Sequence, residues 1–402
     1  MAGHPILRVA VAGAGAFGKN HLRVYRELET AVPDAAMGVA LVAAVEPNAA
    51  RAAETADRYA IPVFATVEEL LAADLRLDAA TVAVPTVHHH AVASALLNAG
   101  LDLLVEKPLA ATLAEADDLI ARADKGKRIL QPGHLERFNP AVLAVQPQLR
   151  RPMFFEAHRL SVFTPRSLDV DVVLDLMIHD LDIVLTFAAS PVREVRAVGL
   201  PILSPKVDIA NVRVEFESGC VANFTASRVS TERVRKLRFF EPRQYVSIDY
   251  ARQDLLVIRV EAGTGKASPA DLIRSLPPQV AAMLSPGIAE GIASGKIDLS
   301  KISPALIAQF AAMAKIDPSV IAQITNLGES KAGLSFSKPD VTPGEPLRLE
   351  IGSFLDSVRT RREPRVTARQ GRNALALALE IQASMAAHAK RAGLEDFFNP
   401  GA

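Results

Sequence analysis

The sequence is poor in several features that mark particular classes of protein. It contains one cysteine and no tryptophan, and aromatic residues make up 5% of the chain. The single cysteine, Cys220, excludes an intramolecular disulfide and a thiolate metal cluster. Lys and Arg together number 45, as do Asp and Glu, so the formal net charge is zero. This balance gives no reason to expect a nucleic acid or an anionic membrane as partner.

Long apolar runs are missing as well. No segment has the ~18 uncharged apolar residues that a membrane-spanning helix requires. Residues 1–5 do not resemble a basic-then-apolar signal segment, so we expect a cytoplasmic protein that does not insert into a membrane. Half of the residues are hydrophobic, and a chain of 402 residues can bury a large core in two or three domains.

The first third of the chain alternates short apolar runs with segments of helical periodicity. This alternation predicts strand–helix units, which build a doubly wound parallel sheet with helices on both faces. We expect this domain to span residues 1–135. The predicted strands are 7–12, 39–45, 79–84, 101–105 and 128–131.

A glycine-rich turn follows the first predicted strand and precedes a helix. Its sequence, Gly13-Ala-Gly15-Ala16-Phe17-Gly18, has the spacing G-x-G-x-x-G. The first glycine permits a tight turn, the second lets a pyrophosphate approach the backbone, and the third lets helix and strand pack closely. The strand–turn–helix context therefore predicts a dinucleotide-binding site of the Rossmann type in this turn.

An acidic residue, Glu46, ends the second predicted strand. A carboxylate there can accept hydrogen bonds from both hydroxyls of the adenosine ribose and repels a 2′-phosphate, which favours NAD over NADP. Arg51 lies close enough in the sequence to weaken that preference. The alternative is that Glu46 is only a solvated loop acid.

Polar residues also follow later strands of the predicted sheet, at the edge where such sheets bind ligands. The candidates for cofactor contact are Pro85, Thr86, His89, Glu106 and Lys107. Adjacent helical residues point about 100° apart, so the three histidines at 88–90 cannot converge on one ion, and we expect no metal site. A lysine near a nicotinamide could donate to a substrate hydroxyl, although Lys107 taken alone is better explained as a surface lysine.

The segment 171–185 predicts a helix that is apolar almost all round. Four ionisable residues lie on one stripe of it, at spacings of four, four and three: Asp171, Asp175, His179 and Asp182. Buried ionisable groups are costly unless they are paired or used. The stripe is therefore either a functional site or a satisfied core histidine with a capping aspartate. Asp180 lies off the stripe, and we expect it to be a structural partner.

From residue 136 onward the pattern changes to alternating strands, which predict an open, mostly antiparallel sheet with one apolar face. Segment 263–343 interrupts this pattern and is rich in Ala, Ile, Ser and Pro. We interpret it as a helical insertion that serves as a lid or an oligomer contact. Two amphipathic helices close the chain. The predicted fold is thus an α/β domain at 1–135 followed by an α+β domain at 136–402.

In combination, three features resemble the Gfo/Idh/MocA oxidoreductase family: the glycine-rich turn, Glu106-Lys107-Pro108, and Asp175 four residues before His179. Further stretches resemble one subgroup of that family, the UDP-N-acetylglucosamine 3-dehydrogenases associated with lipid A biosynthesis. These stretches are 133–140, 169–180, 207–211 and 223–228. The insertion departs from the pattern of typical members.

The resemblance implies NAD-dependent oxidation of a sugar hydroxyl, at C3 of UDP-N-acetylglucosamine in that subgroup, ahead of an aminotransferase. His179 would be the general base, Lys107 would orient and polarise the hydroxyl, and Asp175 would support them. Six residues are expected to contact substrate, with Arg159, Arg166 and Arg228 as candidates for the diphosphate. The six are Arg137, Asn139, Arg159, Arg166, Asp171 and Arg228.

By analogy with the family we expect a homodimer or a homotetramer. Three alternatives stay open: an inositol or glucose dehydrogenase, an NADPH-dependent reductase, and a non-catalytic NAD-sensing regulator. A polyol substrate would not need the arginines. A regulator need not keep Lys107, Asp175 and His179 together, so their presence argues against it.

Overall fold

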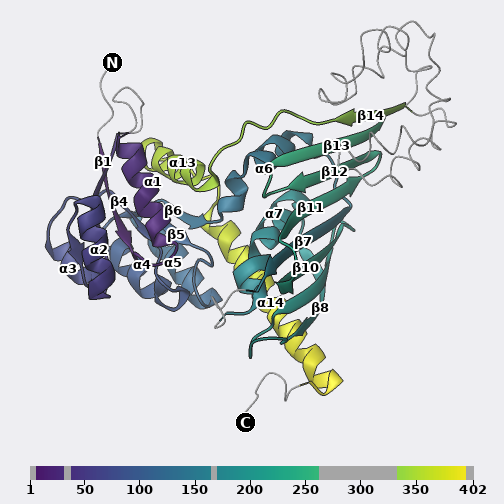
Figure 1. The fold of residues 1–402 in the computed structure, drawn as a ribbon, viewed down its shortest axis with the longest axis horizontal. Helices are drawn as coiled ribbons and strands as arrows, with labels where there is room; N and C mark the ends of the chain where they lie inside the picture. Colours follow the sequence, from purple (N-terminus) through teal and green to yellow (C-terminus); the bar gives the residue numbers. More distant parts are fainter. Residues whose placement is uncertain (1–5, 31–37, 164–169, 262–332, 395–402) are drawn as a thin grey trace, which may run out of the picture.

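The computed structural model describes residues 6–30, 38–163, 170–261 and 333–394 (Figure 1). The first part of the chain forms a six-stranded parallel sheet in the order β3-β2-β1-β4-β5-β6. This is the order of a doubly wound dinucleotide-binding sheet, so the predicted fold class of this part is confirmed. Its strands are β1 (Leu7–Ala12), β2 (Val39–Val45), β3 (Val63–Phe64), β4 (Ala79–Val82), β5 (Asp102–Glu106) and β6 (Leu130–Gly133). The intervening α-helices are α1 (Gly18–Thr30), α2 (Ala49–Tyr59), α3 (Val67–Ala72), α4 (His89–Asn98) and α5 (Leu113–Gly126).

The second sheet has eight strands in the order β14-β13-β12-β11-β7-β10-β9-β8. Neighbouring strands are antiparallel except for β7 and β10, which confirms a mostly antiparallel sheet. A short helix, α6 (Pro140–Val145), precedes it. The strands are β7 (Phe154–Val162), β8 (Val192–Leu200), β9 (Ile209–Phe216), β10 (Val221–Ser230), β11 (Val234–Glu241), β12 (Gln244–Asp249), β13 (Asp254–Glu261) and β14 (Gly333–Ser337).

Strand β14 corrects one expectation. Its residues were assigned to the helical insertion, but they pair antiparallel with β13. A five-residue strand is stabilised by a partner that lies far away in the sequence, so its own residues carry little signal. Most of the expected insertion lies outside the described residues.

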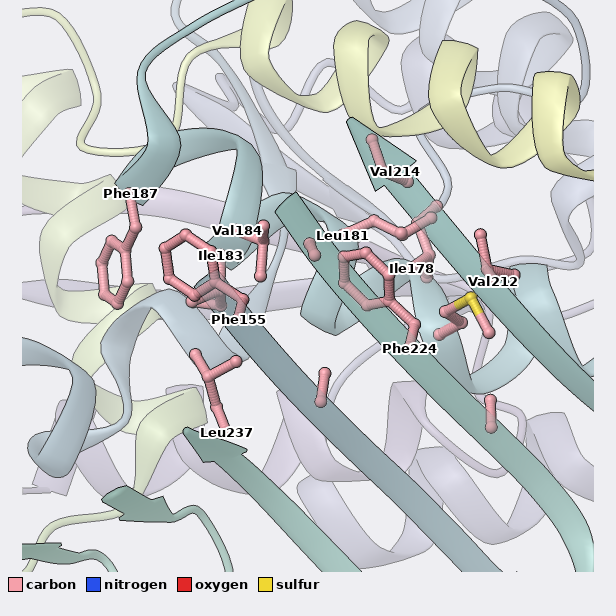
Figure 2. Close-up of a cluster of buried hydrophobic side chains, with 14 of the residues drawn as sticks. Phe155, Ile178, Leu181, Ile183, Val184, Phe187, Val212, Val214, Phe224 and Leu237 are labelled. Carbon is pink, nitrogen blue, oxygen red and sulfur yellow. The ribbon is translucent and has the colours of Figure 1, made fainter. Parts of the chain in front are cut away.

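Two helices, α7 (Ile178–Ala188) and α14 (Ala368–Ala392), pack on one face of the second sheet (Figure 1). Figure 2 shows Leu181 and Phe187 of α7 against Phe155 and Phe224, which project from β7 and β10. Each large apolar side chain buried in this way contributes about 2–3 kcal/mol. The strand alternation, with every second residue buried, therefore fixes α7 to the sheet and sets the position of its polar residues.

The C-terminal helices join the two sheets. Helix α13 (Pro346–Thr360) packs on the first sheet, where Ile351 and Phe354 share an apolar cluster with Val9 of β1 and Leu22 of α1. Helix α14 contacts α5 and β6 as well as α7 and β8. Within the described ranges, none of the helices combines the length and hydropathy needed to cross a bilayer.

Candidate active site

The glycine-rich turn connects β1 to α1 and has the geometry that its glycines predict. Gly13 has a φ of 96°, and a Cβ there would lie 2.7 Å from the carbonyl oxygen of Ala83. A Cβ at Gly18 would lie 1.9 Å from the carbonyl oxygen of Gly13, so both positions require glycine. A Cβ at Gly15 would meet nothing within 4 Å. That open side leaves room for a pyrophosphate to approach the backbone, so the turn fits a dinucleotide.

Glu46 at the end of β2 is 3% exposed, which is not the environment of a solvated loop acid. Its Oε2 accepts from the amide of Ala14 at 3.1 Å, and its Oε1 accepts from the amide of Asn48 and from Arg51 Nη2. Burial works to raise the pKa of Glu46, but the bonds from Arg51 and the two amides outweigh it and lower the pKa on balance. The carboxylate is therefore ionised beside the glycine-rich turn.

His89 was expected to line the cofactor, and the structure does not support that role. It is 1% exposed, with Nδ1 2.8 Å from the carbonyl oxygen of Pro108 and Nε2 2.9 Å from that of Val84. Both ring nitrogens are thus occupied by main chain, and His89 ties the end of β4 to the turn after β5. Pro85 and Thr86 lie at the same end of β4, and Thr86 begins a 3-10 turn. Among the described residues, no three His, Cys, Asp or Glu side chains come together as a metal ion would need.

Lys107 follows β5 and reaches across to the second part of the chain. Its Nζ donates to the carbonyl oxygen of Asp175 at 2.6 Å and to that of Leu174 at 3.4 Å, and it lies 3.7 Å from Asp175 Oδ1. Its side chain is 19% exposed, which is not the environment of an ordinary surface lysine. Burial lowers the pKa of Lys107, while the charges of Asp175 and Glu106 oppose that shift. The two carbonyl oxygens therefore fix the position of the ammonium group, which is a hydrogen-bond donor.

The carbonyl groups that hold Lys107 belong to a π-helical turn, Val173–Met177, which precedes α7. The sequence predicted one continuous α-helix over this stretch. In a π-turn the backbone bonds span one residue more than in an α-helix, and carbonyl groups at its ends are left free to accept. Asp171 caps the turn, since its Oδ1 accepts from the amides of Val173 and Leu174. Asp171 therefore stabilises the start of this turn.

His179 lies in the first turn of α7, and its Nδ1 is buried without a hydrogen-bond partner in the part of the chain that the structure describes. Burial, and next to it the charges of Lys107 and Arg159, hold the pKa of His179 well below its usual value. The imidazole is therefore neutral near pH 7 and free to accept a proton. The structure brings Lys107, Asp175 and His179 together at one place.

The two described arginines expected to bind a diphosphate are engaged elsewhere. Arg159 is 2% exposed, with Nε and Nη2 donating to Asp180 at 2.7 and 3.0 Å and Nη1 donating to Glu136 at 3.0 Å. Arg228 is buried too, 3.6 Å from Asp208 and bonded to the carbonyl oxygen of Val170. These internal ion pairs hold α7 and its preceding segment to the sheet. The expected phosphate role is thus not supported for either one.

The other predicted substrate contacts also have structural partners or fall outside the described residues. Arg137 is buried, bonds to Thr186 of α7 and lies 3.7 Å from Asp182. Asn139 is the N-cap of α6 and donates to the carbonyl oxygen of Tyr250. Arg166 is not among the described residues.

Arg235 is a cation near the site, although its sequence context, Arg233-Val-Arg235-Lys236, favours a solvated sheet edge. It stands opposite Arg159 in the register of β7 and β11, so both side chains project from the inner face of the sheet. Its charge is one of those that lower the pKa of His179. Its Nε is buried without a partner, and it forms no ion pair within the described ranges. Long-range strand pairing, which a single sequence does not display, brings it to the site.

Beneath the site lies a buried acidic cluster of Glu106, Asp182 and Glu350. Glu106 Oε1 lies 2.7 Å from His21 Nε2, and Asp182 lies 3.9 Å from His134 Nδ1. Glu350 is fully buried, and neither of its carboxyl oxygens has a partner within the described ranges. Burial, and then the charges of Glu106 and Asp182, raise the pKa of Glu350 well above its usual value. Of the three acids in this cluster, Glu350 is therefore the one that stays protonated in the folded protein.

The protonated Glu350 predicts an unusual pH dependence of stability. In the unfolded chain a glutamate loses its proton above about pH 4.3, whereas folded Glu350 keeps it to higher pH. The unfolded state then binds fewer protons, so this group lowers the free energy of unfolding by up to about 1.4 kcal/mol per pH unit. Glu350→Gln cannot ionise, and we expect its thermal midpoint relative to wild type to be higher at pH 8 than at pH 5.

The matched control is Glu363→Gln, on the exposed loop after α13. Its midpoint relative to wild type should not change between the two pH values. An equal difference for Glu350→Gln at both pH values would show that Glu350 ionises normally in the folded protein.

Comparison with known proteins agrees with this arrangement. The family profile for the NAD-binding Rossmann fold of the Gfo/Idh/MocA oxidoreductases matches residues 7–134, and the profile for their C-terminal domain matches residues 141–243. Together with the sheet order and the glycine-rich turn, these matches define an NAD-binding oxidoreductase. The chain belongs to the Gfo/Idh/MocA oxidoreductase family.

Individual members of the family differ in how similar they are to this chain. The UDP-N-acetylglucosamine 3-dehydrogenase of Acidithiobacillus ferrooxidans is 37% identical over 259 residues, which are 64% of this chain and 79% of the relative. A solved structure of UDP-N-acetylglucosamine 3-dehydrogenase GnnA from Acidithiobacillus ferrooxidans superposes with a TM-score of 0.72 at 28% identity, covering 98% of this chain and 99% of the other. The inositol 2-dehydrogenase of Acidothermus cellulolyticus is 30% identical over 199 residues, covering 48% of this chain and 56% of the relative.

Proposed function

We propose that the protein uses NAD to oxidise the C3 hydroxyl of UDP-N-acetylglucosamine to a ketone. The observation that carries the proposal is the meeting of Lys107, Asp175 and His179 at the carboxyl end of β5, beyond the glycine-rich turn. The similarity to the UDP-N-acetylglucosamine 3-dehydrogenase of Acidithiobacillus ferrooxidans supports this choice of sugar.

In this proposal each residue has one task. Neutral His179 takes the proton of the sugar hydroxyl, and Lys107 donates to the same oxygen and stabilises the charge that develops on it. The carbonyl groups of Leu174 and Asp175 hold the ammonium of Lys107 in place. Bound NAD supplies the hydride acceptor.

The preference for NAD over NADP rests on Glu46. Its ionised carboxylate lies beside the glycine-rich turn, where it accepts from the amide of Ala14. A 2′-phosphate in this position would meet a like charge. Arg51 donates to Glu46 and so offers a phosphate less of its charge than an unpaired arginine would.

Arg235 is our candidate for the diphosphate of the substrate. It projects from the same sheet face as Arg159, close enough to His179 to influence its pKa, and it carries no carboxylate partner within the described ranges. A guanidinium group binds phosphate oxygens well because its donors form a planar fork.

We propose further that the protein works as a homodimer or homotetramer, ahead of an aminotransferase that converts the ketone to an amine for lipid A. The second sheet supports the first part, because α7 and α14 cover one of its faces and leave the opposite face open to a second copy. The chemistry supports the second, since a 3-keto sugar is the substrate that an aminotransferase at C3 requires.

The test is a direct assay. The purified protein is mixed with NAD and UDP-N-acetylglucosamine, and the absorbance of the reduced nicotinamide is followed while an aminotransferase and glutamate remove the product. We expect turnover with NAD, slower turnover with NADP, and little with free N-acetylglucosamine, which lacks the diphosphate. Turnover of inositol or glucose with none of the UDP-sugar under this coupling would contradict the proposal.

A further inference from the structure

A polar cleft lies at one end of the eight-stranded sheet, where the turn between β11 and β12 meets the end of β13 and the segment before β7. Its volume is about 550 Å³. Arg159, next to the active site, is five strand residues beyond Phe154 at the start of β7, a distance of about 17 Å. The cleft is therefore separate from the site of Lys107 and His179. The charged and amide residues that line it are Arg150, Arg151, Glu241, Arg243, Gln244 and Arg259.

The charges in this cleft are not balanced. Four arginines and one glutamate line it, and the carboxylate of that glutamate is already occupied. Glu241 Oε1 accepts from the amides of Arg150 and Arg151 at 2.8 and 3.1 Å, and its Oε2 accepts from Gln244 at 3.2 Å. Within the described ranges, no ion pair involves any of the four arginines that line the cleft. Positive charges that line one cleft repel one another unless an anion joins them.

Neutral side chains, rather than acids, hold the cleft in shape. Arg259 donates through Nε to Gln244 Oε1 at 2.6 Å and through Nη2 to the side chain of Gln148. Gln244 is itself 8% exposed and donates to the carbonyl oxygen of Gln148. Arg243 has a φ of 66°, in the left-handed region that arginine seldom adopts. Because the partners of Arg259 are neutral amides, they fix the orientation of its guanidinium group without offsetting its positive charge.

We propose that this cleft binds an anion that carries at least two phosphate charges, such as the diphosphate group of a nucleotide. Guanidinium forks match phosphate oxygens in pairs, and a site lined by several of them favours multiply charged groups. The volume is within the range of small-molecule sites. This inference is independent of the proposed reaction, because none of the lining residues takes part in it.

The test is calorimetric titration of inorganic pyrophosphate into the full-length protein saturated with NAD. We expect wild type to bind, and the double variant Arg151→Ala, Arg243→Ala to bind at least tenfold more weakly. Both arginines are exposed, and their side chains make no hydrogen bond in the described part of the chain, so the variant should fold. The matched control, Arg196→Ala with Arg213→Ala, removes two exposed arginines of β8 and β9 and should bind as wild type does.

Separate titrations with UDP and inorganic phosphate distinguish a diphosphate ester from a single phosphate, and we expect UDP to bind more tightly than phosphate. Arg235→Ala should still bind pyrophosphate, although Arg235 is the candidate for the substrate diphosphate in the active site. The proposal is overturned if wild type binds no pyrophosphate, if the double variant binds as tightly as wild type, or if Arg235→Ala abolishes binding. The last result would place the anion in the active site.

Discussion

Replacing His179 by alanine is expected to lower kcat by about 10²–10⁴-fold while NAD binding stays within about twofold of wild type. The loss follows from the proposed mechanism, in which neutral His179 accepts the hydroxyl proton and Lys107 beside it donates. Steady-state kinetics with UDP-N-acetylglucosamine measures kcat, and quenching or calorimetric titration measures NAD binding.

The pH profile gives a second measure of the same role. An imidazole accepts a proton only when neutral, so kcat/KM should fall as the pH drops through the pKa of His179. Burial and Lys107 hold that pKa well below its usual value, so the acid limb of wild type should lie below about pH 6.5. A His179→Ala protein that loses NAD binding together with kcat would show a structural histidine instead.

Replacing Lys107 by methionine is expected to lower kcat by about 10²–10³-fold, because in the proposed mechanism Lys107 is the donor to the developing alkoxide. Methionine retains much of the length and packing of lysine without its charge. The same change removes a positive charge that lowers the pKa of His179, so the acid limb of the variant should move to higher pH. Kinetics across the pH range measures both effects in one experiment.

Lys107→Arg is the matched control, since it keeps the charge but changes the shape of the donor. We expect it to retain the position of the acid limb better than Lys107→Met does. A methionine variant with normal kcat and a raised KM would mean that Lys107 binds the substrate without polarising it.

The features that followed correctly from the sequence are those set by neighbours in the chain. The glycine-rich turn is one, because the spacing of Gly13, Gly15 and Gly18 and the flanking strand and helix are all local. The order of the first sheet is another, since alternating strands and helices leave few topologies. The stripe of Asp175 and His179 was predicted from α-helical periodicity, which is also local, but the π-helical turn at Val173–Met177 interrupts the helix on which that stripe was based.

Features that depend on distant partners were missed or misassigned. An arginine on a strand has the same local pattern whether it faces solvent or an acid, so nothing near Arg159 reveals that it pairs with Asp180 and Glu136. His89 is similar, because its partners are carbonyl groups brought near by the sheet. The burial of Glu350 could have been predicted, because it is an acid on an otherwise apolar face of α13. Its acidic neighbours could not, because they come from β5 and α7, which are distant in the sequence.

The π-turn before α7 has a consequence for how this enzyme can change by mutation. The shortest contact of Lys107 is to the main-chain oxygen of Asp175, which every amino acid possesses. Alanine scanning along this turn therefore cannot remove that contact, and sequence comparison cannot reveal it. A change of chain length can, because deleting one residue would restore an α-helical turn and rotate Asp175 relative to His179 by about 100°. Gene variants that shorten this segment by a single codon would thus be more damaging than most substitutions within it.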